Sequence, residues 1–156
     1  MYLYIVILLM GLLPLFSVNV EFVAGGAQSG MLHLVGKWFV FWSVGARLFL
    51  AGLRQSVQPR FTAEKIFELE TNAPLHVIQE LGFANISIGL LGLVSIASRE
   101  WCIPAAVTGA TFYCLAGFKH LKSKHRNSLQ NVAMSSDLFV FCVLAVYLAA
   151  TFATKA

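Results

Sequence analysis

Four ionisable residues that lie within long apolar runs or at their ends, all near one membrane face by depth, are Arg47, Glu80, His120 and Asp137. A charged side chain near the centre of a membrane-spanning helix costs about 3 kcal/mol on insertion scales, so such residues are expected to have partners or a function. A guanidinium, an imidazole and carboxylates can bind a polar solute or relay a proton. These residues therefore predict a polar site within a membrane protein.

Three of these side chains share one depth when residues are counted from the ends of their apolar runs. At 1.5 Å per helical residue, Arg47, Glu80 and Asp137 lie roughly 9 to 10 Å below the membrane boundary. We expect them to converge on one pocket that opens to the aqueous side, and Asn85 and Asn131 would extend its polar surface. The candidates for binding or proton relay are Arg47, Glu80, Asn85, His120, Asn131 and Asp137.

The composition is typical of a chain embedded in a bilayer. Of its 156 residues, 58% are hydrophobic and only 12% are charged, and the mean hydropathy is +0.77. A spanning helix needs about 20 mostly apolar residues, and the stretches that qualify are 2–24, 31–53, 74–97, 101–121 and 132–152. They are too long and too weakly alternating for barrel strands. We expect a single membrane domain over 1–156, an all-α polytopic helix bundle without a soluble catalytic domain.

The first apolar run has a second interpretation. The small-residue stretch AGGAQSG follows it, as at the cleavage site of a signal peptide. No Lys or Arg precedes its apolar part, and this absence favours a retained helix. Cleavage would leave four spanning helices in the same orientation.

Lys and Arg residues concentrate in two of the predicted connections. Seven of them lie in or beside 54–73 and 119–131, whereas the opposite side carries Arg99 and Lys155. Positive charge marks cytoplasmic loops. We therefore expect both connections and the N-terminus in the cytoplasm, and the C-terminus in the periplasm, of a bacterial inner membrane. The basic stretch KHLKSKHR fits contact with anionic lipid headgroups, and no nucleic-acid partner is expected.

The first of these connections contains the segment 61–70, FTAEKIFELE. Thr62 is a candidate N-cap, and Glu64 would lie in the first helical turn. The mixture of apolar and charged residues predicts either a short helix at the membrane interface or an ordinary helical linker.

The charged layer also has a purely structural interpretation. Two carboxylates and one guanidinium at one depth can be buried partners that fix helix register without any ligand. Arg47 would match only one of the two carboxylates, and the unmatched negative charge favours a functional site.

A metal ion could use that charge, because His76, Glu80, His120 and Asp137 are weak candidate ligands. Only His76 and Glu80 are spaced to share a helix face. The three cysteines form no CxxC motif, so we expect neither a metal nor a cofactor.

Two further charged residues, Glu21 and Lys37, flank the turn between the first and second runs. Their proximity through that turn predicts a structural ion pair at the opposite membrane face. Two independent side chains that extend toward the headgroups would fit the sequence equally well.

Several segments taken together, GARLFLAGLRQ, ELGFANISIGLLGL, IPAAVTGATFYCLAGFKH and NVAMSSDLFVF, resemble a small bacterial inner-membrane family of unknown function over about residues 45–143. More loosely, RLFLAGL resembles the first helix of DoxX-like four-helix membrane proteins. The family resemblance implies a multi-pass helical fold and carries no established reaction.

The leading functional hypothesis is a multi-pass membrane protein whose cytoplasm-facing polar pocket binds or passes a small solute, ion or proton. An accessory or assembly protein with a structural charged layer is one alternative. A membrane enzyme that acts on a lipid or quinone is another. The expected partners are the lipid bilayer and either further copies of the chain or another membrane protein.

Overall fold

The computed structural model describes residues 2–25, 30–66, 75–124 and 126–154. Five of its helices are long and apolar enough to cross a membrane: Leu3–Val23, Met31–Val57, Leu75–Val94, Arg99–Lys122 and Ser128–Ala153. No strand occurs in the described ranges. The prediction of an all-α bundle with five membrane-spanning helices is therefore confirmed.

The first two spanning helices are each interrupted by a π-helical segment. The first consists of α1 (Tyr2–Ile7), η1 (Leu8–Leu12) and α2 (Leu13–Val23), and the second of α3 (Met31–Phe39), η3 (Val40–Ala46) and α4 (Arg47–Val57). The two π segments pack against each other. The Ser43 hydroxyl donates a hydrogen bond to the Leu9 carbonyl at 3.4 Å, and the Tyr113 hydroxyl donates one to the Ser43 carbonyl. These bonds join three spanning helices at one buried point.

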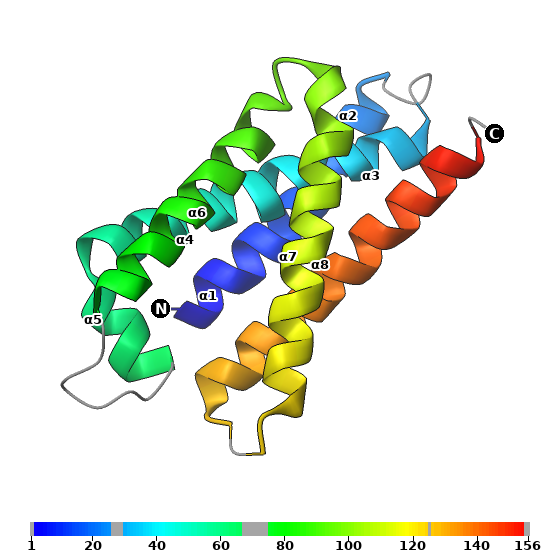
Figure 1. The fold of residues 1–156 in the computed structure, drawn as a ribbon. Helices are drawn as coiled ribbons and strands as arrows, with labels where there is room; N and C mark the ends of the chain where they lie inside the picture. Colours follow the sequence, from blue (N-terminus) through cyan, green and yellow to red (C-terminus); the bar gives the residue numbers. More distant parts are fainter. Residues whose placement is uncertain (1, 26–29, 67–74, 125, 155–156) are drawn as a thin grey trace.

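The remaining elements are α5 (Pro59–Phe61), η4 (Thr62–Ile66), α6 (Leu75–Val94), η5 (Arg99–Trp101), α7 (Cys102–Lys122) and α8 (Ser128–Ala153). Of the predicted interfacial segment 61–70, the structure describes only Phe61 and η4. The start of α1 lies at the end of the molecule that carries α5, and α8 finishes at the opposite end (Figure 1).

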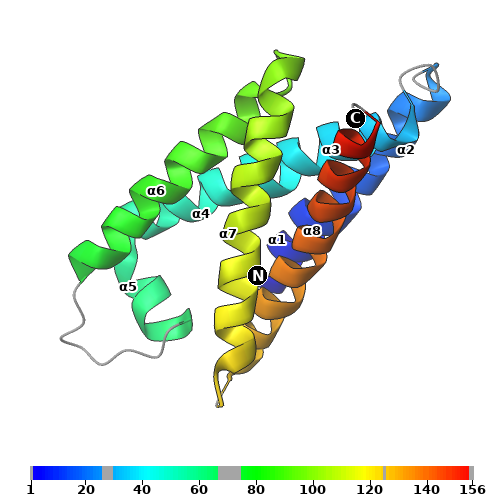
Figure 2. The same cartoon turned by 45° about the vertical axis from the view of Figure 1, so that its right-hand side comes forward.

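The spanning helices associate mainly as pairs, α4 with α6 and α7 with α8. The two pairs approach each other near the connection between α6 and α7, and they diverge toward the end that carries α5 (Figure 2). The first spanning helix packs into the bundle as well, because Val6 and Met10 belong to the buried core.

Glycines in η3 and α4 allow the second spanning helix to pack with its backbone in contact with α6. A Cβ atom added at Gly52 would lie 2.5 Å from the Gly82 carbonyl oxygen, and one added at Gly92 would lie 2.5 Å from the Gly45 nitrogen. Small residues at these positions are what permits such close approach of two membrane helices. The α4/α6 pair is therefore a closely fitted unit.

The connection between α7 and α8 is held by side chains. One Arg126 nitrogen donates to the carbonyl oxygens of His120, Leu121 and Ser123 at 3.1, 3.0 and 2.9 Å, and these carbonyls lie at the end of α7. Asn127 and Gln130 form a capping box at the start of α8. Both helix ends therefore have partners for backbone groups that the helix itself leaves unpaired.

Candidate functional site

A cavity of about 510 Å³ separates the α4/α6 pair from the α7/α8 pair at the end where the pairs diverge. Residues from all four helices line it, together with Ile5 of α1, Phe61 of α5 and Thr62 of η4. Its volume falls within the roughly 300 to 1,000 Å³ that is usual for small-molecule pockets. Four of the six predicted binding candidates line this cavity: Arg47, Asn85, His120 and Asp137.

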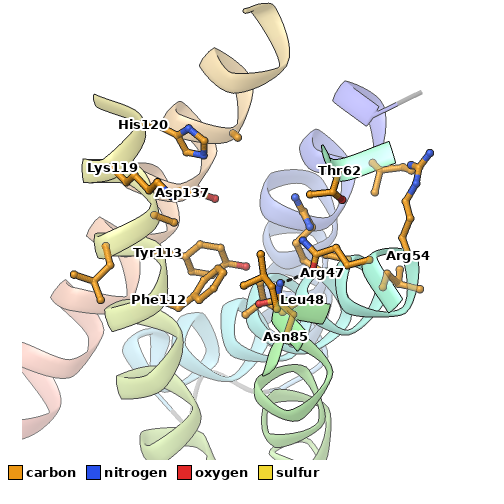
Figure 3. Close-up of a pocket in the computed structure, with 18 of the residues that line it drawn as sticks. Arg47, Leu48, Arg54, Thr62, Asn85, Phe112, Tyr113, Lys119, His120 and Asp137 are labelled. Carbon is orange, nitrogen blue, oxygen red and sulfur yellow. Dashed lines mark hydrogen bonds between the residues drawn. The ribbon is translucent and has the colours of Figure 1, made fainter. Parts of the chain in front are cut away.

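Asp137 lies in the buried stripe of α8. The buried positions recur every three or four residues, as expected for the inward face of a helix, and they are Gln130, Ala133, Asp137, Val140, Leu144 and Tyr147. Asp137 is only 8% exposed, and no described residue forms a hydrogen bond or salt bridge with its carboxylate. The carboxylate points into the cavity, toward the side occupied by Arg47 (Figure 3).

Arg47 begins α4, and the residues that follow it at helical spacing line the same cavity. These are Ala51, Arg54 and Gln55, at four, seven and eight positions further along, so one face of α4 forms a cavity wall. Arg47 contributes an electrostatic attraction to Asp137 from across the cavity, although the two side chains do not form a direct salt bridge.

Asn85 connects the two helices of the α4/α6 pair within the site. Its amide nitrogen donates a hydrogen bond to the Gln55 side-chain oxygen at 2.7 Å. The residue is 2% exposed, and its own oxygen Oδ1 has no hydrogen-bond partner among the described residues. Unpartnered buried polar atoms are uncommon in native proteins, so this oxygen marks the site as unusual.

The polar side chains form two tiers at different distances from the helix ends. The inner tier consists of Arg47, Asn85, Tyr113 and Asp137, each nine or ten residues from the helix end nearest the α5 side, or roughly 14 to 15 Å. The outer tier consists of Arg54, Phe61, Lys119 and His120, near the ends of their helices. Apolar side chains line the cavity as well: Leu48, Leu50, Leu81, Phe112 and Leu115.

In the outer tier, Arg54 stacks on an aromatic ring. The central carbon of its guanidinium lies 3.5 Å from the centroid of the Phe61 ring. Such stacking is a favourable use of Arg, because its planar edges remain able to donate hydrogen bonds. No described residue accepts a hydrogen bond from this guanidinium.

Glu80 does not line the cavity, contrary to the expectation of a shared layer. Its side chain is exposed on α6, and it lies five residues before Asn85, which corresponds to a rotation of about 140° around the helix axis. Counting residues along the chain estimates depth but not the direction of a side chain. Glu80 is also only five residues from the start of α6, closer to the helix end than Arg47 or Asp137.

Asn131 is the second predicted candidate that the cavity excludes. It is exposed, and its side-chain oxygen accepts a hydrogen bond from the Arg126 Nε at 3.0 Å. It precedes Asp137 by six residues and is therefore rotated about 120° away from it around α8. Its contact with Arg126 makes it part of the α7–α8 connection.

The absence of Glu80 reverses the expected charge of the site. Among the described lining residues, Arg47, Arg54 and Lys119 are basic and Asp137 is acidic. The lining thus carries an excess of positive charge, whereas the sequence predicted one surplus negative charge.

In the part of the chain that the structure describes, no three His, Cys, Asp or Glu side chains come close enough to share a metal ion. His76 and Glu80 are exposed on α6, away from the cavity.

The predicted ion-pair candidates Glu21 and Lys37 lie together at the other end of the bundle. The Lys37 Nζ is 2.7 Å from the Glu21 Oε2 and 2.8 Å from its Oε1. The Trp38 Nε1 donates to the same carboxylate at 2.7 Å. This carboxylate links α2 to α3 and has the partners that Asp137 lacks.

Sequence reasoning missed Gln55, Thr62 and Leu81 as lining residues. A signal for Gln55 was present, because it lies eight residues after Arg47 and so on the same helix face. The sequence predicts Thr62 only as a helix cap. Its position against the cavity depends on the path of the chain after α4.

Five long apolar helices around a partly polar cavity define a polytopic α-helical membrane protein. The chain belongs to a family of unknown function (DUF6790), whose family model matches residues 1–155. The predicted membership of a family of unknown function is confirmed over almost the whole chain, and the comparisons give no support to a DoxX-like relationship or a bacterial origin. No curated protein and no solved structure gives a significant match.

Proposed function

We propose that this membrane protein binds a small solute in the cavity between the α4/α6 and α7/α8 pairs, with Asp137 as a principal contact. The observation that carries the proposal is the carboxylate of Asp137, a residue that is only 8% exposed: this group points into a cavity of about 510 Å³ and has no hydrogen-bond partner among the described residues. Leaving a buried charged acceptor unsatisfied costs about 1–3 kcal/mol or more. A bound solute that donates a hydrogen bond would offset that cost.

The comparison with Glu21 argues against a purely structural role for Asp137. Glu21 accepts two hydrogen bonds from Lys37 and one from Trp38, which is how this protein satisfies an acidic group that joins two helices. Asp137 has no such contact, and the nearest candidate, Arg47, influences it only at longer range. A carboxylate that fixed helix register would be expected to contact its partner directly.

The outer-tier residues are near the helix ends that adjoin α5 and the connection between α7 and α8. These connections hold most of the Lys and Arg residues of the loops, so the positive-inside rule favours a cytoplasmic location for this end of the cavity. We infer that solute reaches Asp137 from the cytoplasm, and that passage across the membrane would require a further opening toward the α2–α3 end.

The proposal can be tested by native mass spectrometry of the protein extracted with its own membrane lipids. Ala116 lines the cavity, and Ala116→Trp is expected to fill part of it. Ala84 is exposed on α6, so Ala84→Trp adds the same bulk outside the cavity and serves as the matched control. We expect a bound small molecule on the wild type and on Ala84→Trp, and its loss from Ala116→Trp.

Equal retention by all three proteins would show that the bound molecule occupies another surface. An unoccupied wild type under conditions that preserve lipid adducts would likewise contradict the proposal.

A further inference from the structure

The two tiers of the cavity differ in what they can recognise. The inner tier places the Asp137 carboxylate opposite the Arg47 guanidinium across the cavity (Figure 3). A carboxylate only accepts hydrogen bonds, and a guanidinium only donates them. A ligand group between them must therefore donate to one and accept from the other. A hydroxyl group does both, and it adds no net charge to a part of the cavity where one acidic and one basic residue already balance.

The outer tier is suited to an anion. Arg54 stacks on Phe61 at 3.5 Å, an arrangement that fixes the guanidinium plane and leaves its edges available to a carboxylate or phosphate. Lys119 lines the cavity from the opposite wall, on α7, so its charge raises the overall positive potential without contacting a group held at Arg54 (Figure 3). No acidic residue lines this tier among the described residues.

The distance between the two tiers and the apolar side chains between them indicate the length and polarity of the middle part of the ligand. Arg54 follows Arg47 by seven residues along α4, which corresponds to about 10 Å. Apolar side chains line the cavity beside these groups, including Leu48, Phe112 and Leu115. A ligand that reaches both tiers must therefore bury an apolar segment about 10 Å long.

We infer, on the basis of the solute-binding function proposed above, that the ligand is an elongated amphiphile with an anionic group at one end and a hydroxyl at the other. The anionic group lies at Arg54, the apolar segment lies along α4 and α7, and the hydroxyl donates to Asp137. This chemistry is that of a free hydroxylated acid, whereas an anionic membrane lipid offers the anion and the apolar segment without a hydroxyl at the far end.

Three probes of matched chain length test this inference: 8-hydroxyoctanoate, octanoate and octane-1,8-diol. Each is titrated against the protein in phosphatidylcholine nanodiscs, and binding to empty nanodiscs is subtracted. We expect 8-hydroxyoctanoate to bind at least about tenfold more tightly than either of the others, because octanoate lacks the hydroxyl that donates to Asp137 and the diol lacks the negative charge that pairs with Arg54.

Two substitutions separate the contributions of the tiers. Arg54→Gln is expected to remove the preference for 8-hydroxyoctanoate over the diol, and Asp137→Asn to remove its preference over octanoate. Arg60→Gln and Glu80→Gln are the matched controls, because both residues are exposed and neither lines the cavity. These controls should keep both preferences within about twofold of the wild type.

The outcomes distinguish this inference from the function on which it rests. Equal affinity for all three probes, abolished by Ala116→Trp, would overturn the assigned ligand class and leave solute binding in the cavity intact. Failure of every probe to bind would also overturn the class, and the retention experiment above would then decide the proposed function independently. Nanodiscs that contain phosphatidylglycerol test the membrane as a source, because this lipid has an anionic group and an apolar chain but no hydroxyl at the end of that chain. Unchanged binding of 8-hydroxyoctanoate would support a free hydroxylated acid as the ligand, and strong competition would overturn the hydroxyl part of the inference.

Discussion

Substitution of Asp137 should have opposite effects on folding stability and on ligand binding. The carboxylate receives no hydrogen bond from a described residue, so Asp137→Asn removes a buried charge without breaking such a bond. The unsatisfied charge costs about 1–3 kcal/mol or more, and the substitution removes this cost. It also removes the attraction between Asp137 and Arg47, which offsets part of the gain in stability. We therefore expect Asp137→Asn to raise the free energy of unfolding by about 1 kcal/mol.

Glu21→Gln is the matched comparison, because this carboxylate is fully partnered. It accepts bonds at 2.7 and 2.8 Å from Lys37 and at 2.7 Å from Trp38. Both members of the ion pair remain partly exposed, at 27% and 30%, so solvent weakens the interaction. A loss of about 1 kcal/mol in unfolding free energy is expected.

The assay is reversible unfolding by sodium dodecyl sulfate in mixed micelles, followed by tryptophan fluorescence, with the ligand absent. The two substitutions should shift the midpoint in opposite directions. A destabilisation of about 1 kcal/mol or more by Asp137→Asn would show that the carboxylate supports the fold, and the argument that it is maintained for a ligand would fail.

Three further predictions concern packing, capping and transport. Gly52→Ala is expected to lower the unfolding free energy by about 1–3 kcal/mol, because the new methyl group would overlap the Gly82 backbone. Gly11→Ala is the control and should not destabilise the protein, because the space around its Cβ position is open. The unfolding midpoints of both variants test this prediction. Asn127→Ala removes the α8 cap and should cost about 1 kcal/mol, measured by the same unfolding titration. If the cavity passes solute, Asp137→Asn should reduce solute flux into proteoliposomes by at least about tenfold. Glu80→Gln should leave the flux unchanged. Wild-type flux from both variants would exclude the cavity as the route.

The spanning helices could be predicted because the information for them is local. Each apolar run is long enough to cross a bilayer, and no tertiary contact is needed to identify it. The π-helical segments η1 and η3 could not be predicted in this way. Their hydrogen-bond pattern is supported by contacts between helices, such as those of Ser43 with Leu9 and Tyr113.

The candidate site could be predicted in part, because depth and direction are separate properties of a helical residue. Depth can be counted from the end of an apolar run, and this placed Arg47 and Asp137 at a common level. Direction depends on which face of each helix meets its neighbours. For α6 that face is set by Gly82 and Gly89 against α4, and Asn85 shares it whereas Glu80 does not. The glycine spacing in the sequence contained this information, but only once α4 was known to be the partner.

The same packing explains how a poorly satisfied acid can persist in a membrane bundle. Helices can shift to bury or pair a costly group only if their contacts permit sliding, and the α4/α6 pair does not, since its glycine contacts leave no room for even one added carbon. On the other side, Gly117 packs directly against Leu138 of α8, the residue next to Asp137. Each pair is thus fixed internally, so no helix can slide within its pair to bring a hydrogen-bond donor to Asp137. A ligand that donates to Asp137 should therefore stabilise the protein without rearranging either helix pair.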